Sequence, residues 1–339
     1  MKKAFSLLMT GILFVFVLSA CGQKSQEQVM SALKDKLESL KGYKAEATMT
    51  LHAGDKPSTY NVEIWYQKPD HYRIHLENKK QQLSQMILKN DQGVFVLTPQ
   101  LNKSYRFQSE WPENGSQWYL YESLLKDIVN DPEPSFQRGD GTYVFTTKTN
   151  YKHKDLQKQK ITLSQKDLKP VSVQIMSGDE KVVVDMKFNK MTFNAEFGNR
   201  AFDLKKNMTS AKMQLSTKAS GDGVKESSSF QVFYPTELPA HTKLSAKKVT
   251  ADDGKKYVFQ YTGENSFTLI EQKSVAWSDT VEPATVTGTP VNLGFAIGHM
   301  TKNSVSWNYK GTDFFLASKD LTQPQMADLA RSVLGKQMK

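Results

Sequence analysis

The sequence predicts a mostly β protein of the α+β class, with two domains in tandem. The chain has 339 residues, which is more than one hydrophobic core usually serves. Apolar and polar residues alternate in many short segments, at the regular spacing of an antiparallel meander. The helical spacing of apolar residues is confined to segments near residues 26–41, 116–130 and 322–335.

The composition excludes several kinds of site. The chain has one cysteine, so it cannot form an internal disulfide, a thiolate zinc site or a redox Cys-x-x-Cys motif. Lys and Arg number 45 against 35 Asp and Glu, for a net charge of +10. This basic balance fits nucleic acid, an anionic membrane surface or an acidic partner.

The first residues indicate which of these partners is available. Lys2 and Lys3 precede an apolar run of 13 residues at 5–17, which is shorter than the roughly 20 residues of a membrane-spanning helix and fits a signal peptide. The run ends in Leu18-Ser19-Ala20-Cys21, which resembles the lipobox of bacterial lipoproteins. The resemblance implies that residues 1–20 are a signal peptide and that Cys21 carries diacylglycerol. We therefore expect an extracytoplasmic protein, lipid-anchored to the outer face of the cell membrane, with no nucleic-acid partner.

A short tether and a helix follow the anchor. Residues 21–26 form the anchor and tether, of which Gly22 to Gln26 reach at most about 18 Å. Ser25 and Gln28 have the spacing of a capping box at the start of a helix over 26–41, where the apolar residues predict one buried face.

The first folded domain is predicted over residues 27–205. Its alternating segments predict strands at 43–51, 60–67, 72–77, 84–89, 93–98, 103–108, 142–149, 158–165, 170–177 and 181–188, with a further extended segment near 191–197. A helix at 116–130 interrupts them.

Two motifs within these strands resemble the family of the periplasmic lipoprotein carrier LolA. One runs from Ile64 through Trp65 and Pro69 to Arg73, and the other is the turn and strand 90–96 followed by Pro99. The resemblance implies a curved antiparallel half-barrel covered by helices. Lys68 stands where the carrier has a functional Arg, although lysine lacks the guanidinium fork. Lys68 and Arg73 are therefore candidates for gating or partner contact.

One face of this predicted sheet collects large apolar side chains. With two residues near the helix, the candidates for lining a cavity are Tyr60, Val62, Ile64, Tyr66, Tyr72, Ile74, Leu76, Trp118 and Tyr121. The helices could fill the face completely and make it a core. Alternatively, an unfilled cavity would hold an acyl chain or an apolar peptide, and the resemblance implies such use of the concave face.

A second, smaller α+β domain is predicted at 230–339, after a polar linker at 206–229. Its strands are predicted at 244–250, 255–262, 266–275, 293–299, 303–309 and 312–318. Thr322 and Gln325 form a second capping box before the last helix. This order of elements resembles the C-terminal domains of RseB-type envelope-stress regulators. The two-domain plan of the whole chain resembles that of sporulation lipoproteins of the YdcC type.

Residues that could carry chemistry are few. The sequence contains no HExxH, GxSxG, Walker or GxGxxG motif. His71 and His75 share a predicted strand face with Arg73 and Glu77, where we expect a solvent-facing surface rather than a metal site. The carboxylates of Asp127, Asp131 and Glu133 are expected to be solvated at the end of a helix. We expect no catalytic residues, metal or cofactor.

The function that the sequence predicts is non-enzymatic binding at the membrane. The protein would be anchored in the bilayer through Cys21 and hold an apolar ligand, or a lipidated or peptide segment, in sporulation or another cell-envelope process. One alternative is an RseB-like regulator that docks on a membrane protein. A further alternative is an enzyme that modifies the wall or a lipid.

Overall fold

The computed structural model describes residues 24–52, 57–78, 80, 83–108, 118–149, 156–219, 231–250, 256–278 and 282–333. The predicted signal peptide, Cys21 and the end of the predicted linker lie outside these residues. The chain divides into two units, Met1–Ser39 and Leu40–Lys339. No helix in the described part of the chain is long and apolar enough to cross a membrane.

Helix α2 (Gln26–Ser39) is the described element of the first unit. The predicted capping box is confirmed: the backbone N–H of Ser25 donates to Gln28 Oε1 at 2.8 Å, and the N–H of Gln28 donates to Ser25 Oγ at 3.3 Å. The helix ends at Ser39, two residues before the predicted end.

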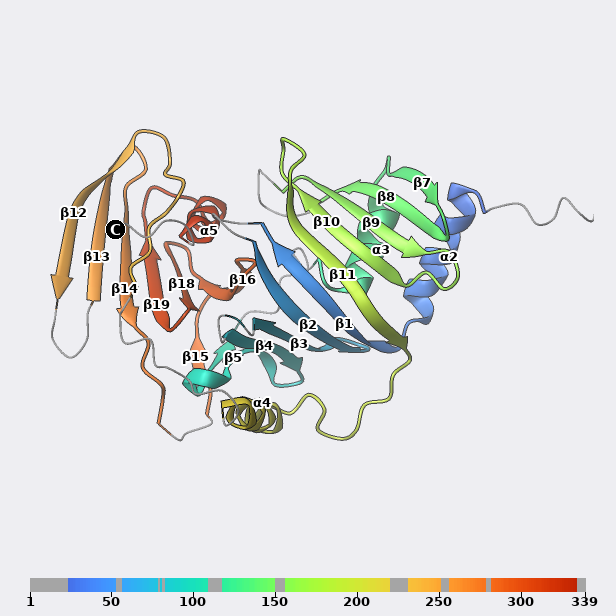
Figure 1. The fold of residues 1–339 in the computed structure, drawn as a ribbon, viewed down its shortest axis with the longest axis horizontal. Coiled ribbons are helices and arrows are strands. Elements are labelled where there is room, and N and C mark those ends of the chain that lie inside the picture. The colour runs from blue at the N-terminus through green and yellow to red at the C-terminus, as the bar shows by residue number, and fades with distance from the viewer. Residues whose placement is uncertain are drawn as a thin grey trace, which may run out of the picture. The chain divides into compact units, whose positions relative to one another are not determined.

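The second unit begins with an open, curved sheet of twelve strands (Figure 1). Their order is β15-β6-β5-β4-β3-β2-β1-β11-β10-β9-β8-β7, and every pairing except β15 with β6 is antiparallel. The bounds are β1 Gly42–Leu51, β2 Ser58–Gln67, β3 His71–Asn78, β4 Leu83–Asn90, β5 Gly93–Thr98, β6 Lys103–Phe107, β7 Ser135–Gly139, β8 Thr142–Lys148, β9 Lys158–Ser164, β10 Pro170–Met176, β11 Val182–Phe193 and β15 Ala284–Val286, with the short 3-10 helix η3 at Pro99–Leu101. The predicted fold class is confirmed.

Alternation of apolar residues explains how this sheet acquires an inner face. The register pairs Ala45 with Ile64 and Met49 with Tyr60, so that the buried side chains of β1 and β2 point to the same side. Helix α3 (Tyr121–Asn130) covers part of this inner face. At its start, the backbone N–H of Tyr121 donates to the hydroxyl of Tyr43 on β1 at 3.0 Å. Its residues Leu124, Leu125 and Ile128 are fully buried.

The opposite, outer face of β4 and β5 is covered by helix α4 (Leu204–Ala219). This helix occupies residues 206–219 of the segment 206–229 that the sequence predicts as a linker. The polar composition of the segment conceals the helix. Its few apolar residues are sufficient to dock it, in a cluster made of Met86, Leu88, Phe95, Leu97, Phe202, Leu204, Met208 and Ala211.

The second sheet has seven strands, in the order β12-β13-β14-β19-β18-β17-β16. Their bounds are β12 Thr242–Thr250, β13 Lys256–Gly263, β14 Phe267–Lys273, β16 Thr289–Asn292, β17 Ile297–Met300, β18 Ser304–Tyr309 and β19 Thr312–Ala317. Helix α5 (Gln323–Ser332) follows, with the predicted capping box between Thr322 and Gln325. Met326, Leu329 and Ala330 are its buried apolar residues, as the predicted stripe requires.

Some strands differ from the prediction. Strand β11 is one continuous strand where the sequence suggests two segments, and β7 and β16 are not predicted at all. Strand β15 belongs to the second half of the chain, but it pairs in parallel with β6 of the first sheet, where Ala284 lies opposite Tyr105. Its three residues are too few to show an alternating pattern, and no local signal specifies so distant a partner.

Candidate functional site

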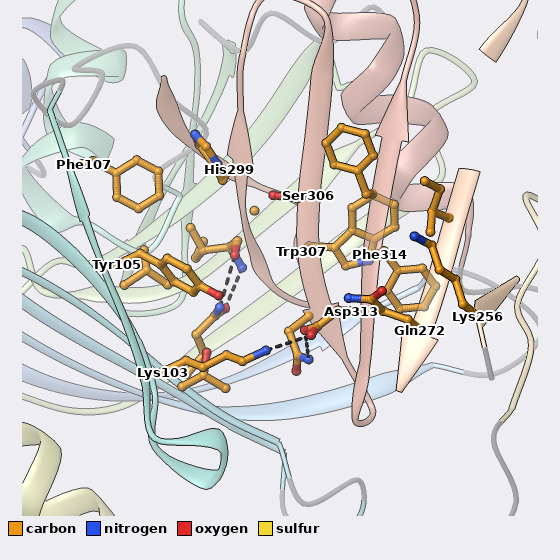
Figure 2. Close-up of a pocket in the computed structure, with 18 residues that line it drawn as sticks. Lys103, Tyr105, Phe107, Lys256, Gln272, His299, Ser306, Trp307, Asp313 and Phe314 are labelled. Atoms are coloured by element: carbon orange, nitrogen blue, oxygen red, sulfur yellow. Dashed lines mark hydrogen bonds and ion pairs between the residues drawn. The ribbon is translucent and has the colours of Figure 1, made fainter. Parts of the chain in front are cut away.

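The candidate site is a cavity of about 340 Å³ between strands β4–β6 of the first sheet and strands β14 and β17–β19 of the second (Figure 2). Aromatic and aliphatic side chains line most of it. The first sheet contributes Tyr105 and Phe107, and the second contributes Ile270 and Phe315. On β6 the lining residues Lys103, Tyr105 and Phe107 are two residues apart, so alternation points them to the same space. On β18 Ser306 and Asn308 share the cavity face, whereas Trp307 between them belongs to the opposite, buried face of the strand.

One end of the cavity is polar, and its polar groups are already paired. Lys103 Nζ lies 2.8 Å from Asp313 Oδ2, and the amide of Asn308 donates to Asp313 Oδ1 at 2.9 Å. Gln85 exchanges two hydrogen bonds with the backbone of Ile297, at 2.6 and 3.1 Å. The contacts of Lys103 with Asp313 and of Gln85 with Ile297 cross from the first sheet to the second and join the two walls of the cavity.

Aromatic groups at the cavity are closely packed, and one of them reaches the surface. The rings of Trp307 and Phe314 are stacked, with centroids 4.9 Å apart and an interplanar angle of 1°, on the face of the second sheet opposite Ser306 and Phe315. Phe107 meets His299 edge to face at 5.5 Å. Phe315 remains 42% exposed, which gives the cavity an apolar mouth. The arrangement can take an apolar group out of water without rearrangement of the walls.

The nine residues that the sequence nominates for a cavity lie elsewhere. Those on β2 and β3 share the inner face, where Tyr66 stacks on Tyr72 at 5.0 Å and Tyr43 meets Tyr121 edge to face at 6.1 Å. Trp118 is buried just before α3. None of the nine lines the cavity between the sheets or the two more open pockets at β4–β6. Their contact with a ligand stays a prediction.

The carboxyl group of Glu122 is buried among these tyrosines. The sequence does not reveal this burial. Glu122 Oε2 accepts a hydrogen bond of 2.9 Å from the hydroxyl of Tyr43. Burial raises the pKa of the Glu122 carboxyl and raises that of the Tyr43 hydroxyl well above its usual value. A glutamate in the first turn of a helix is normally a solvated, dipole-stabilising residue, so no sequence signal marks this one as buried.

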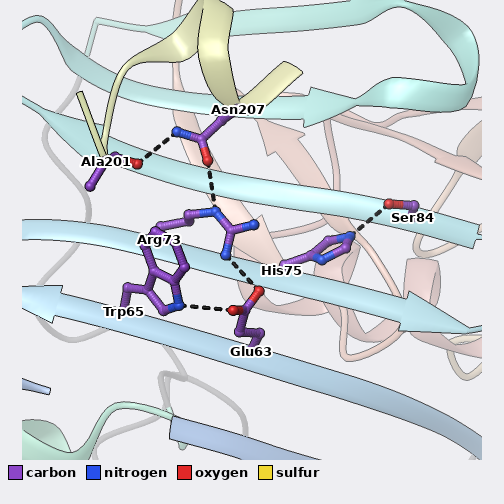
Figure 3. Close-up of polar contacts among 7 residues, drawn as sticks. All are labelled: Glu63, Trp65, Arg73, His75, Ser84, Ala201 and Asn207. Carbon is purple, nitrogen blue, oxygen red and sulfur yellow. Dashed lines mark hydrogen bonds and ion pairs between the residues drawn. The ribbon is translucent and has the colours of Figure 1, made fainter. Parts of the chain in front are cut away.

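Arg73 and Lys68, the two candidates for gating or partner contact, have different environments. Lys68 is exposed, in the turn between β2 and β3. Arg73 is only 8% exposed and lies beneath α4 (Figure 3). Its Nη1 donates to Glu63 Oε2 and its Nε to Asn207 Oδ1, both at 2.7 Å, and its guanidinium group lies 4.3 Å from the centre of the Trp65 ring. Arg73 therefore fastens α4 to the sheet.

This contact corrects the expectation that the strand face with Arg73 is open to solvent. Helix α4 covers part of the face because Asn207 supplies an acceptor for the buried guanidinium group. His75 hydrogen-bonds Ser84 Oγ at 2.8 Å, and His71 Nε2 lies 3.2 Å from Asp91. The two imidazoles therefore contact different groups.

The predicted carboxylates do not form a joint site. Asp127 accepts a hydrogen bond from Gln159 at 2.7 Å, whereas Asp131 accepts from the backbone of Glu133 at 3.0 Å and of Lys148 at 2.8 Å. Within the described ranges, no group of three or more histidine, cysteine, aspartate or glutamate residues is arranged to hold a metal ion.

Comparison with solved structures finds distant similarity. The complex of MucA and MucB from Pseudomonas aeruginosa aligns with a TM-score of 0.33 and 10% identity, over 89% of this chain and 96% of that one. A LolA superfamily protein from Nitrosomonas europaea has a TM-score of 0.30 and 11% identity, over 53% and 98%. The CwlD amidase from Clostridioides difficile in complex with the GerS lipoprotein has a TM-score of 0.27 and 17% identity, over 53% and 98%.

Comparison of sequences gives a much stronger match. A family profile described as "Sporulation protein YdcC-like" matches residues 1–202. The "Sporulation protein YdcC" of Bacillus subtilis (strain 168) is 47% identical over 340 residues, which cover 100% of this chain and 99% of that protein. The chain therefore belongs to the sporulation protein YdcC-like family.

Proposed function

We propose that this protein is a lipid-anchored, extracytoplasmic binding protein of sporulation that holds an apolar group in the cavity between its two sheets and does not transform it. The observation that carries the proposal is the cavity itself, about 340 Å³ lined largely by aromatic and aliphatic side chains. Cavities for small ligands occupy about 300–1,000 Å³ and combine such walls with a few polar groups. The name of the B. subtilis relative supports the link to sporulation.

The shape and charge of the site favour a ligand with an apolar chain and an anionic end. The interior polar groups Lys103 and Asp313 are bound to each other, so they offer little to a buried charge. Lys256 also lines the cavity and forms no ion pair with a described residue. An acyl chain would therefore lie against Ile270 and Phe315, which are cross-strand partners, while its acidic end contacts Lys256.

Anchoring through Cys21 fits this ligand. The lipobox-like residues 18–21 imply two acyl chains on the cysteine, which are enough for stable attachment to a membrane. The residues between Cys21 and helix α2 are few, so the binding domain would work close to the bilayer from which an acyl ligand comes.

The proposal is tested with a fluorescent stearic acid analogue and the full-length protein in nonionic detergent. Ser306→Trp places an indole ring in the cavity, so we expect binding to weaken by about tenfold or more, as loss of most apolar contacts would cause. Ser304→Trp is the matched control on the same strand, two residues away and outside the lining. Equal binding by both folded variants would contradict the proposal.

Docking on a protein partner is a second candidate function. The observation that favours it is the long, exposed edge of the second sheet at β12. This edge is separate from the cavity, so the two activities do not exclude each other.

A further inference from the structure

Strand β12 is an unusually open edge. It has nine residues, pairs with β13, and has no strand on its other side among the described residues. All of its residues except Thr242 are exposed. The other sheet edges are much shorter, with five residues in β7, four in β16 and three in β15. Unpaired backbone groups on a long edge bind another strand readily, and proteins normally keep such edges short.

The two faces of β12 differ in chemistry. A register shift at Ser245 lets Leu244 and Val249 share one face, opposite Tyr261 and Tyr257 of β13. These two apolar side chains are 37% and 50% exposed. The other face presents Lys243 and Lys248. Lys247, opposite Phe259, lies on the same face as Leu244 and Val249. A strand laid beside β12 would therefore meet two apolar side chains and Lys247 on one face, and the ammonium groups of Lys243 and Lys248 on the other.

The lysines on this strand are not equivalent. Lys247 is held by the hydroxyl of Tyr234 at 3.0 Å and lies over the rings of Tyr257 and Phe259, at 5.3 and 5.6 Å. Lys243 and Lys248 form no ion pair with any described residue. They remain available for a partner.

The charge pattern selects the kind of partner. Strand β12 contains three lysines and no acidic residue, so a second copy of this strand would oppose lysine to lysine. Like charges across a strand pair are unfavourable, whereas opposite charges are favourable. A carboxylate-bearing strand satisfies Lys243 and Lys248, and its β-branched side chains cover Leu244 and Val249.

We propose that β12 is a docking edge that adds one extended segment of a partner protein, in which acidic residues alternate with β-branched apolar residues. The backbone of the segment continues the seven-stranded sheet, which gives affinity. The alternation of acidic and apolar residues in the segment gives specificity. A shift by one residue would place its carboxylates on the face of Leu244 and Val249.

The test uses a synthetic peptide of repeated Glu-Val dipeptides, capped at both ends, with the full-length protein in nonionic detergent. Fluorescence anisotropy measures binding, and hydrogen exchange measures protection of the backbone amides. We expect saturable binding with protection of amides in residues 246–250 and no change in β7. A Lys-Val peptide of the same length should not bind. Equal binding of both peptides, or binding without protection of β12, would overturn the proposal.

Variants separate this edge from general attraction to a basic protein. Lys243→Glu combined with Lys248→Glu should weaken binding of the Glu-Val peptide by about tenfold or more, because two attractive cross-strand pairs become repulsive. Lys187→Glu combined with Lys190→Glu makes the same change of charge on β11, an interior strand of the other sheet, and should leave binding unchanged. An equal loss in both variants would show bulk electrostatics and contradict docking at β12.

Discussion

Lys103 Nζ on β6 lies 2.8 Å from Asp313 Oδ2 on β19, and this ion pair joins the first sheet to the second. Lys103 is buried, and Asn308 holds the second carboxylate oxygen of Asp313 at 2.9 Å. The pair closes the polar end of the cavity. It is therefore a contact on which both the stability of the junction and the shape of the site depend.

Removing one partner of this pair should be costly. Lys103→Met leaves the carboxylate of Asp313 without its counter-ion, and breaking a buried pair costs about 3–5 kcal/mol. Because the side chain of Asp313 is 26% exposed, we expect a smaller loss of about 1–3 kcal/mol in the free energy of unfolding, measured with urea. The double variant Lys103→Met/Asp313→Leu should recover part of the loss. A double variant that is less stable than Lys103→Met would contradict this interpretation.

The contact between Arg73 and Asn207 should control the docking of α4. Asn207→Ala removes the acceptor for the buried Nε, and an unmade hydrogen bond to a charged group costs about 1.5–3 kcal/mol. We expect faster hydrogen exchange throughout residues 204–215. Arg200→Lys changes an exposed ion pair beside the same helix and serves as the control, with an effect below about 0.5 kcal/mol. Unchanged exchange in Asn207→Ala would exclude this role.

Glu271 should make the stability of the protein depend on pH. Burial raises the pKa of its carboxyl to about 8, from an ordinary value near 4.5, while Oε2 accepts a hydrogen bond from the backbone N–H of Phe233 at 2.9 Å. Between these pH values the folded state holds a proton that the unfolded state has lost. The free energy of unfolding should therefore fall as pH rises from 4.5 to 8, by at most about 1.4 kcal/mol per pH unit.

Glu271→Gln isolates this effect from other buried acids such as Glu122. Glutamine keeps an acceptor for Phe233 but cannot lose a proton. Urea unfolding at pH 5 should give similar stability for the variant and the wild type, and the variant should be the more stable at pH 8.5. An identical fall with pH in both proteins would assign the dependence to another group.

The capping box of α5 should contribute to the stability of the second sheet. Thr322→Ala removes the oxygen that accepts the backbone N–H of Gln325, which typically costs about 1 kcal/mol. Thr322→Ser keeps the oxygen and should stay within about 0.5 kcal/mol of wild type. Thermal or urea unfolding distinguishes the two variants, and an equal loss in both would show that the hydroxyl group has no part in it.

Local patterns predict the regular part of this fold well. Alternation identifies β1 to β6, and the capping boxes at Ser25 and Thr322 locate two helix starts, because these signals depend on neighbours in sequence. Helix α4 and strand β15 escape prediction because their stability comes from distant contacts, Asn207 with Arg73 and Ala284 with Tyr105. The sequence therefore suggests a linker where the structure has a helix.

The site was harder to predict than the fold. The sequence correctly gathers Tyr60, Ile64 and Ile74 on one face, but it cannot show that these side chains are packed in a core. The cavity between the sheets needs residues from strands far apart in the chain, such as Tyr105 and Phe315. Each of these aromatic residues has an ordinary place in an alternating strand, so no local pattern marks it as a site residue.

The most direct test of the central claim is photo-crosslinking of the full-length protein with a stearic acid analogue that carries a diazirine on its chain. Mass spectrometry then identifies the labelled residues. The account predicts labels on the lining of the cavity between the sheets, at Tyr105, Ile270 or Phe315, and their loss in Ser306→Trp. Labels confined to the inner face, at Tyr60, Ile64 or Ile74, would contradict it and would place the ligand beneath α3 instead.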